Sequence, residues 1–205
     1  MRGWRAFRKA KEGLAAVEFA LLLPVMIGLF FGVVETTLAL LCRADVSVMA
    51  STAANLISEV STPNSTDISN VYAAASAILY PNPTGTAATQ PTIRITSIIY
   101  NTQTPTNLAT GTVAWTCTQS GSGTLSPASL TKGQTVNFTD SSGSNPLSIM
   151  MANGSVIMAE VAYGYTSPTM QIIKTKLNLT NVWYTKPRRV AQIPAPSPAP
   201  SGCST

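Results

Sequence analysis

A glycine and a carboxylate near the N-terminus are the residues whose types and spacing point most directly to chemistry. Gly13 is followed by an apolar segment that begins at Leu14, and Glu18 is the fifth residue of that segment. An ionised carboxylate is costly inside lipid, so Glu18 marks a function. Residues 1–12 carry one acid, Glu12, and five basic side chains: Arg2, Arg5, Arg8, Lys9 and Lys11. This order of basic leader, glycine and apolar segment with an early Glu predicts cleavage by a peptidase after the glycine.

The segment from Gly13 to Glu35 resembles the TadE-like minor pilins, or pseudopilins, of the tight-adherence (Flp) pilus system. The resemblance covers about the first fifth of the chain. It is carried by these residues in their expected order: Gly13, Glu18, Phe19, Leu23, Pro24, Gly32 and Glu35. It implies that a prepilin peptidase, a membrane aspartyl peptidase, cuts after Gly13 and leaves Leu14 as the new N-terminus. It also implies that Glu18 pairs with the amine freed at Leu14 of a neighbouring subunit.

The resemblance further implies partners and a location. The expected partners are the prepilin peptidase, other pilin or pseudopilin subunits, the inner-membrane pilus assembly platform and membrane lipid. The basic leader predicts a cytoplasmic N-terminus, because Lys and Arg are retained on that side of a bacterial inner membrane. The C-terminal domain is then expected in the periplasm or in a surface pilus. The expected role is structural, in the pilus fibre, at its tip or in assembly alone, and the family is linked to secretion and adhesion.

Composition argues against nucleic-acid binding, metal binding and catalysis. The net charge is +5, but removing the five basic residues of the leader from the thirteen Lys and Arg leaves eight, against seven Asp and Glu. The mature chain therefore has no electrostatic footprint for nucleic acid. The absence of histidine removes Ser-His and Cys-His catalysis and the commonest metal ligand. We expect no cofactor and no enzyme, since an active site would need carboxylates distant in sequence to meet in space.

The apolar segment 14–42 predicts a transmembrane helix. It would span about 44 Å as a helix, which exceeds a hydrocarbon core of about 30 Å. Apolar residues continue at helical spacing beyond Arg43, so we expect one helix from Leu14 to about Glu59 that becomes the spine of the outer domain.

Several residues of this helix favour packing or assembly. Pro24 lacks an amide hydrogen and should bend the helix. Gly28 and Gly32 form a G-x-x-x-G pattern that favours close approach of another helix. Glu35 lies toward the outer end, where solvent or a subunit partner would satisfy it. For Glu18, the alternative to subunit pairing is a side chain that extends toward the lipid headgroups and recruits nothing.

The remaining chain predicts an α+β domain, residues 43–185, between the leader (1–13) with its membrane helix (14–42) and a Pro-rich tail (186–205). Asp67 is the expected N-cap of a second helix. Strands are expected over residues 92–100, 111–118, 134–139, 155–166 and 173–180, the last extended by 182–184. Packed on the spine, they would make a small, mostly antiparallel, pilin-like sheet.

Two further interpretations concern aromatic side chains and the tail. Core packing explains the aromatic residues more simply than a ligand-stacking face does: Trp115, Tyr163, Tyr165, Trp183 and Tyr184. The five prolines from Pro187 to Pro200 predict an extended, partly disordered spacer.

The three cysteines leave two alternatives open. No C-x-x-C is present, which argues against a zinc or redox motif. In an oxidising periplasm Cys117 and Cys203 can form a disulfide, and Cys42 can pair with another subunit. Three unpaired thiols are equally compatible with the spacing.

The main alternative function is an uncleaved single-pass membrane protein whose outer domain binds a ligand or the cell wall. A cleaved secretory signal is disfavoured because the apolar region is long and contains Glu35. A lipoprotein anchor at Cys42 is disfavoured by the bulky Leu41 before it.

Overall fold

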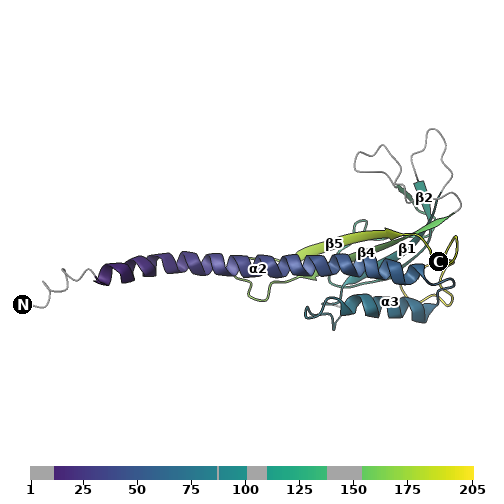
Figure 1. Cartoon of the computed structure of the whole chain (residues 1–205). Coiled ribbons are helices and arrows are strands. Elements are labelled where there is room, and N and C mark those ends of the chain that lie inside the picture. The colour runs from purple at the N-terminus through teal and green to yellow at the C-terminus, as the bar shows by residue number, and fades with distance from the viewer. Residues whose placement is uncertain (1–11, 87, 101–109, 138–153) are drawn as a thin grey trace, which may run out of the picture. The chain divides into compact units, whose positions relative to one another are not determined.

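The computed structural model of the chain describes residues 12–86, 88–100, 110–137 and 154–205. Within these residues the fold is α+β, as predicted (Figure 1). Its elements are α2 (Glu12–Ser58), α3 (Ser65–Ala77), β1 (Thr92–Tyr100), β2 (Thr110–Gln119), β3 (Thr135–Asn137), β4 (Ser155–Tyr165), β5 (Leu177–Thr185) and β6 (Cys203–Ser204). The chain divides into two compact units. We call residues 12–40 with 166–176 the helix unit, and residues 41–165 with 177–205 the sheet unit.

Helix α2 confirms the prediction of one long N-terminal helix. It begins at Glu12, continues through Pro24 and ends at Ser58. Of the described helices, it is the one that is long and apolar enough to cross a membrane. Within the helix unit its large apolar residues lie mostly at the surface, as Val17 and Leu21 show with 65% and 74% exposure. A surface of this kind is typical of a helix that faces lipid or other helices.

The first turn of α3 corrects one prediction. The N-cap is Asn64, not Asp67. The Asn64 side chain accepts a 2.9 Å hydrogen bond from the Asp67 amide, and the Asp67 carboxylate accepts a 3.0 Å hydrogen bond from the Asn64 amide. Asp67 is therefore the third residue of a reciprocal capping box, which satisfies two amides that a helix start leaves unpaired.

The sheet is antiparallel, with the strand order β3-β2-β1-β4-β5, and β6 pairs with β2 outside this path. β1 has the predicted bounds, and β2 and β4 begin or end within one residue of theirs. β3 is shorter than the predicted strand, whose last two residues, 138 and 139, lie outside the described residues. The two-residue β6 carries too little pattern to be predicted.

The start of β5 corrects a second prediction. The alternation of apolar and polar residues predicts a strand from Ile173, but β5 begins at Leu177. The amide of Ile173 donates a 2.6 Å hydrogen bond to the Glu35 carboxylate and so belongs to the helix unit. A backbone amide used in this way is not available to pair with a neighbouring strand.

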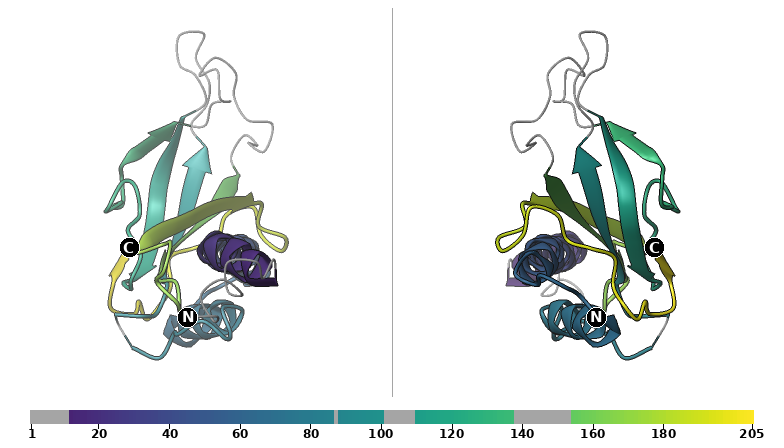
Figure 2. Two further views of the ribbon diagram at one scale, coloured as in Figure 1. Left: turned by 90° about the vertical axis from the view of Figure 1, so that its left-hand side faces the viewer. Right: turned by 90° about the vertical axis from the view of Figure 1, so that its right-hand side faces the viewer.

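The core of the sheet unit lies between the helices and the sheet. From α2 it takes Val46, Met49, Ala53 and Ile57, and from α3 it takes Ile68, Val71 and Ala75. These helical segments lie together on one side of the sheet (Figure 2). All eleven residues of β4 are buried, so its other face is covered as well. On that face Ile98, Val113 and Met158 form a cluster that packs against Leu130.

The loop between β2 and β3 is held close to the sheet. A side-chain carbon added to Gly123 would lie 2.2 Å from the Ala162 carbonyl carbon, so only glycine fits there. The Gly123 carbonyl also accepts a 2.6 Å hydrogen bond from the buried Thr92 hydroxyl. Gly202 combines a φ of +89° with an equally close approach to the Thr118 carbonyl oxygen, at 2.4 Å.

The Pro-rich tail is not a solvated spacer, and that prediction is wrong. Trp115 donates its indole N–H to the Ile193 carbonyl at 2.9 Å, and Ile193 is buried. The Ser197 amide donates a 3.0 Å hydrogen bond to the Pro63 carbonyl. Proline lacks the amide donor but keeps its carbonyl acceptor. Up to Pro200 the tail thus docks through isolated hydrogen bonds, outside any regular strand pairing, and through apolar contacts. The tail therefore belongs to the sheet unit.

Four of the five aromatic residues expected in the core are buried or half-buried. Trp115, Tyr163 and Tyr165 are each at most 4% exposed, and Tyr184 packs partly against the Ile98 cluster. Trp183 differs, because it lies on the edge strand β5 and is 44% exposed. An edge strand has one neighbouring strand instead of two, so its side chains gain less cover.

Candidate assembly site on the N-terminal helix

The predicted cleavage position lies at the start of α2. Gly13 and Leu14 belong to its first turn, while most of the basic leader, residues 1–11, lies outside the described residues. Glu18 follows one turn later, and both Glu18 and its neighbour Phe19 are exposed. Among the residues that the structure describes, none pairs with the Glu18 carboxylate, which is exposed among apolar neighbours. Such a group is available to a cationic partner from outside the chain, and it also favours the positive end of the helix dipole.

Gly28 and Gly32 line a shallow apolar groove on the same helix. The groove has a volume of about 440 Å³, and it is bounded by Gly28, Leu29, Gly32, Val33, Thr36, Thr37 and Ile172. A side-chain carbon added to either glycine would meet nothing within 4 Å, so packing inside this chain does not require glycine at these positions. The hydroxyls of Thr36 and Thr37 bond back to helix carbonyls at 2.7 and 2.8 Å, which leaves the groove apolar.

Glu35 is buried and its carboxylate is bound by the segment that joins β4 to β5. The amides of Gln171 and Ile172 donate to it at 2.7 and 3.0 Å, and the Ile173 amide donates at 2.6 Å. The Thr169 hydroxyl donates a fourth hydrogen bond. Three successive amides that converge on one anion form a nest, and Met170, with φ +50°, makes the turn that precedes them. We call residues 166–176 the clasp loop.

The structure separates Glu18 and Glu35 along the helix. Glu18 and Glu35 are seventeen residues apart, which is about 26 Å along a helix. The Glu35 carboxylate finds its hydrogen-bond donors within the chain. The sequence alone had left two alternatives open for it, solvent and a subunit partner. Sequence reasoning missed the clasp loop because its donors are backbone amides, which every residue except proline carries. The only sequence feature that could have indicated this loop is the polar Thr169, which lies close to residues 171–173 in the sequence.

The cysteines lie in the sheet unit. Cys117 and Cys203 face each other in the β2–β6 register and form a disulfide, with Cα atoms 4.0 Å apart. Cys42 is a free thiol and is 1% exposed, so it is not presented to another subunit. Within the residues that the structure describes, no three Cys, His, Asp or Glu side chains gather as a metal site.

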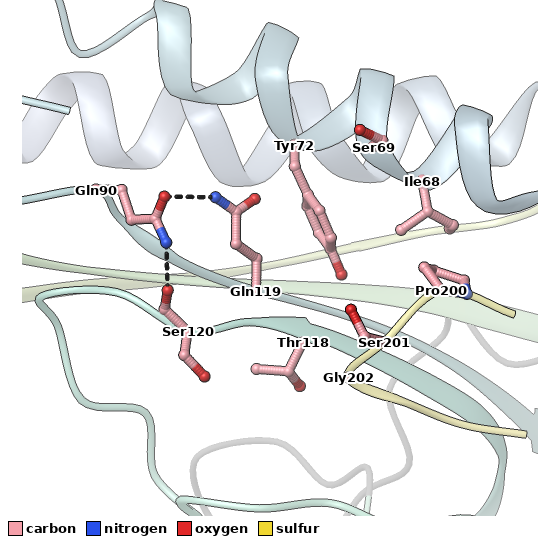
Figure 3. A pocket seen from close by; sticks show the side chains of 10 residues that line it. All are labelled: Ile68, Ser69, Tyr72, Gln90, Thr118, Gln119, Ser120, Pro200, Ser201 and Gly202. Atoms are coloured by element: carbon pink, nitrogen blue, oxygen red, sulfur yellow. Dashed lines mark hydrogen bonds between the residues drawn. The ribbon is translucent and has the colours of Figure 1, made fainter. Parts of the chain in front are cut away.

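The sheet unit also contains a polar groove of about 420 Å³ between α3, the end of β2 and the C-terminal segment (Figure 3). Gln119 donates a 3.1 Å hydrogen bond to Gln90, which in turn donates to the Ser120 carbonyl at 2.6 Å. Tyr72 reaches from α3 toward β2, and burial raises the pKa of its hydroxyl well above the ordinary value. The groove contains no charged side chain.

Comparison with known proteins concerns the N-terminal helix. Residues 13–55 match the model of a family described as TadE-like protein. The match begins at the predicted cleavage glycine and includes Glu18, Pro24 and Glu35. Neither the curated proteins nor the solved structures include a match to the chain. The resemblance inferred from the sequence is thus confirmed for residues 13–55, which are similar to TadE-like proteins.

Proposed function

We propose that the chain is a minor pilin or pseudopilin of a Tad/Flp-type pilus, with a structural and not a catalytic role. The observation that carries the proposal is the TadE-like match, which starts at Gly13 and continues through a helix whose apolar side chains are mostly exposed within the helix unit. Such a helix stores the subunit in the inner membrane until assembly, because its surface is stable only against lipid or other helices. The sheet unit would then supply contacts outside the membrane.

Maturation and assembly are assigned to the first turns of α2. A prepilin peptidase cuts the Gly13–Leu14 bond and frees the amine of Leu14. Within a bundle of subunits that excludes water, this ammonium and the Glu18 carboxylate of a neighbour attract each other strongly, since few other partners are available there. The pair would fix the axial register of one subunit on the next.

The deciding experiment is N-terminal sequencing of the protein taken from its native membrane. A chain that starts at Leu14 supports the proposal. A chain that retains the leader favours the alternative, an uncleaved single-pass protein whose outer domain binds a ligand or the cell wall. The polar groove beside Tyr72 is the feature that supports this alternative.

A further inference from the structure

The clasp loop is fixed to the transmembrane helix at a definite height. Four hydrogen bonds, from Thr169, Gln171, Ile172 and Ile173, end on the single carboxylate of Glu35. Glu35 and the loop belong to the same compact unit. The position of Glu35 along the helix therefore sets the position of the loop.

That height corresponds to the boundary of the hydrocarbon core. A helix rises about 1.5 Å per residue, so a core of about 30 Å takes up about 20 residues. The first apolar residue after the basic leader, Leu14, lies at the cytoplasmic boundary. Counted from there, the hydrocarbon ends near residue 33, about half a turn before Glu35. The clasp loop consequently lies where acyl chains meet the headgroups of the opposite leaflet.

The loop presents apolar side chains at this height. Met170 and Ile172 are 47% and 56% exposed. Ile172 also borders the helix groove with Gly28 and Gly32, which lie about two turns and one turn before Glu35 and thus inside the hydrocarbon core. An exposed isoleucine beside lipid-facing helix residues is surrounded by acyl chains once the helix spans a bilayer.

Basic side chains follow directly. Lys174 and Lys176 are both exposed, and residues 166–176 contain no Asp or Glu. The loop thus combines an apolar tip with two positive charges, the pattern by which a segment lies in a membrane interface and contacts anionic lipid. The long lysine stems allow the ammonium groups to reach phosphate oxygens while the backbone stays at the boundary.

We propose that the clasp loop is a second membrane contact: Met170 and Ile172 insert among the acyl chains of the outer leaflet, and Lys174 and Lys176 bind the phosphates of anionic phospholipid headgroups. The contact ties the start of β5 to the membrane surface. It does not depend on cleavage after Gly13 or on assembly into a pilus.

The first test measures the surroundings of Ile172 in the full-length chain. A nitroxide is placed at Ile172→Cys in a Cys42→Ala background, with the chain reconstituted in phosphatidylcholine–phosphatidylglycerol bilayers. The matched control is Val182→Cys, an exposed aliphatic position on β5. We expect the ratio of oxygen to nickel-complex accessibility to be several-fold higher at 172 than at 182. A higher accessibility of 172 to the water-soluble nickel complex would overturn the proposal. So would spin–spin broadening that grows with protein density, because a second copy would then cover the loop.

The second test isolates the lysines. A lysine near an anionic surface strengthens attachment by about fivefold. The label at 172 should therefore lie deeper in bilayers that contain phosphatidylglycerol than in pure phosphatidylcholine, and Lys174→Gln with Lys176→Gln should abolish this difference. The control Lys132→Gln, an exposed lysine of the sheet unit, should preserve it. Equal depth of the unsubstituted loop in both bilayers would refute the headgroup contact.

Discussion

Arg94 and Glu160 form a buried ion pair across two neighbouring strands. They are direct partners in the β1–β4 register, and Arg94 Nε donates a 2.6 Å hydrogen bond to Glu160 Oε2. Their side chains are 0% and 5% exposed. Arg94 also donates from Nη1 to the Pro127 carbonyl at 2.8 Å, so the pair joins β1, β4 and the loop that covers them.

Replacing one partner of this ion pair should lower the free energy of unfolding far more than replacing both partners. Arg94→Met leaves a buried, unpaired carboxylate and should lower the free energy of unfolding by about 3–5 kcal/mol. The double variant Arg94→Met with Glu160→Leu should recover most of that loss. Urea unfolding of the full chain in detergent micelles, followed by Trp fluorescence, measures both. If the two single effects simply add in the double variant, the pair is not a coupled unit.

Removing the Glu35 carboxylate should release the clasp loop without unfolding the sheet unit. In Glu35→Ala the amides of Gln171, Ile172 and Ile173 lose their acceptor, so their hydrogen exchange should accelerate strongly. Amides of the central strand β1 should keep their protection. Thr37→Val is a matched control, because the Thr37 hydroxyl donates to the Val33 carbonyl of its own helix. Unchanged exchange at residues 171–173 in Glu35→Ala would contradict the arrangement.

The regular elements were predictable because their residues repeat with the period of the structure. Apolar residues at helical spacing located α2 and α3, and the Ile/Thr-rich run from Thr92 to Tyr100 located β1 with its observed bounds. The predicted N-cap of α3, Asp67, is the wrong polar residue. Both Asn64 and Asp67 are good N-cap residues, and only the fold shows from which amide each side chain accepts a hydrogen bond.

The clasp loop and the docked tail were not predictable from patterns. The run from Ile173 alternates like a strand, but its first amide, that of Ile173, donates a hydrogen bond to Glu35, 138 residues away in the chain. In the same way the Ile193 carbonyl accepts from Trp115, 78 residues earlier. A long-range hydrogen bond to a backbone atom cannot be predicted from residue type, because all residues carry the same backbone carbonyl group.

Tyr163 should make the stability of the chain fall at alkaline pH. Burial, with smaller contributions from Cys42 and Tyr165, raises the pKa of Tyr163 to about 12, against about 10 in an unfolded chain. The neutral hydroxyl donates a 3.0 Å hydrogen bond to the Pro83 carbonyl. Its contribution is therefore complete below about pH 10 and is lost as the pH rises toward 12.

The test of this pH dependence compares Tyr163→Phe with Tyr80→Phe, which removes an exposed hydroxyl. At neutral pH Tyr163→Phe should cost about 1 kcal/mol, the value of one hydrogen bond. At about pH 11 the difference from the unsubstituted chain should shrink, because the unsubstituted chain has lost part of its advantage. A difference that stays constant between the two pH values would show that Tyr163 does not titrate in this way.

Reduction of the Cys117–Cys203 disulfide should destabilise the sheet unit. The bond closes a loop of 86 residues and holds β6 beside β2, so its loss should lower the free energy of unfolding by about 2–5 kcal/mol. Urea unfolding with and without dithiothreitol measures the effect. The variant Cys117→Ala with Cys203→Ala should resemble the reduced chain and should not respond to the reductant. An equal response in both chains would assign the effect to another group.

Substitutions of Gly13 and Glu18 should block different steps if the first turns of α2 are both a cleavage site and an assembly site. Gly13→Val places a branched side chain at the residue before the scissile bond, so the mature band on an immunoblot should disappear. Glu18→Ala leaves that bond intact and should yield the mature band, but it removes the partner of the freed amine and should reduce surface pili several-fold. Glu35→Ala is the matched acid control, since its carboxylate is already bound within the chain. It should be cut normally. A normal mature band from Gly13→Val would place the cleavage elsewhere, and a full yield of pili from Glu18→Ala would exclude its carboxylate from subunit pairing.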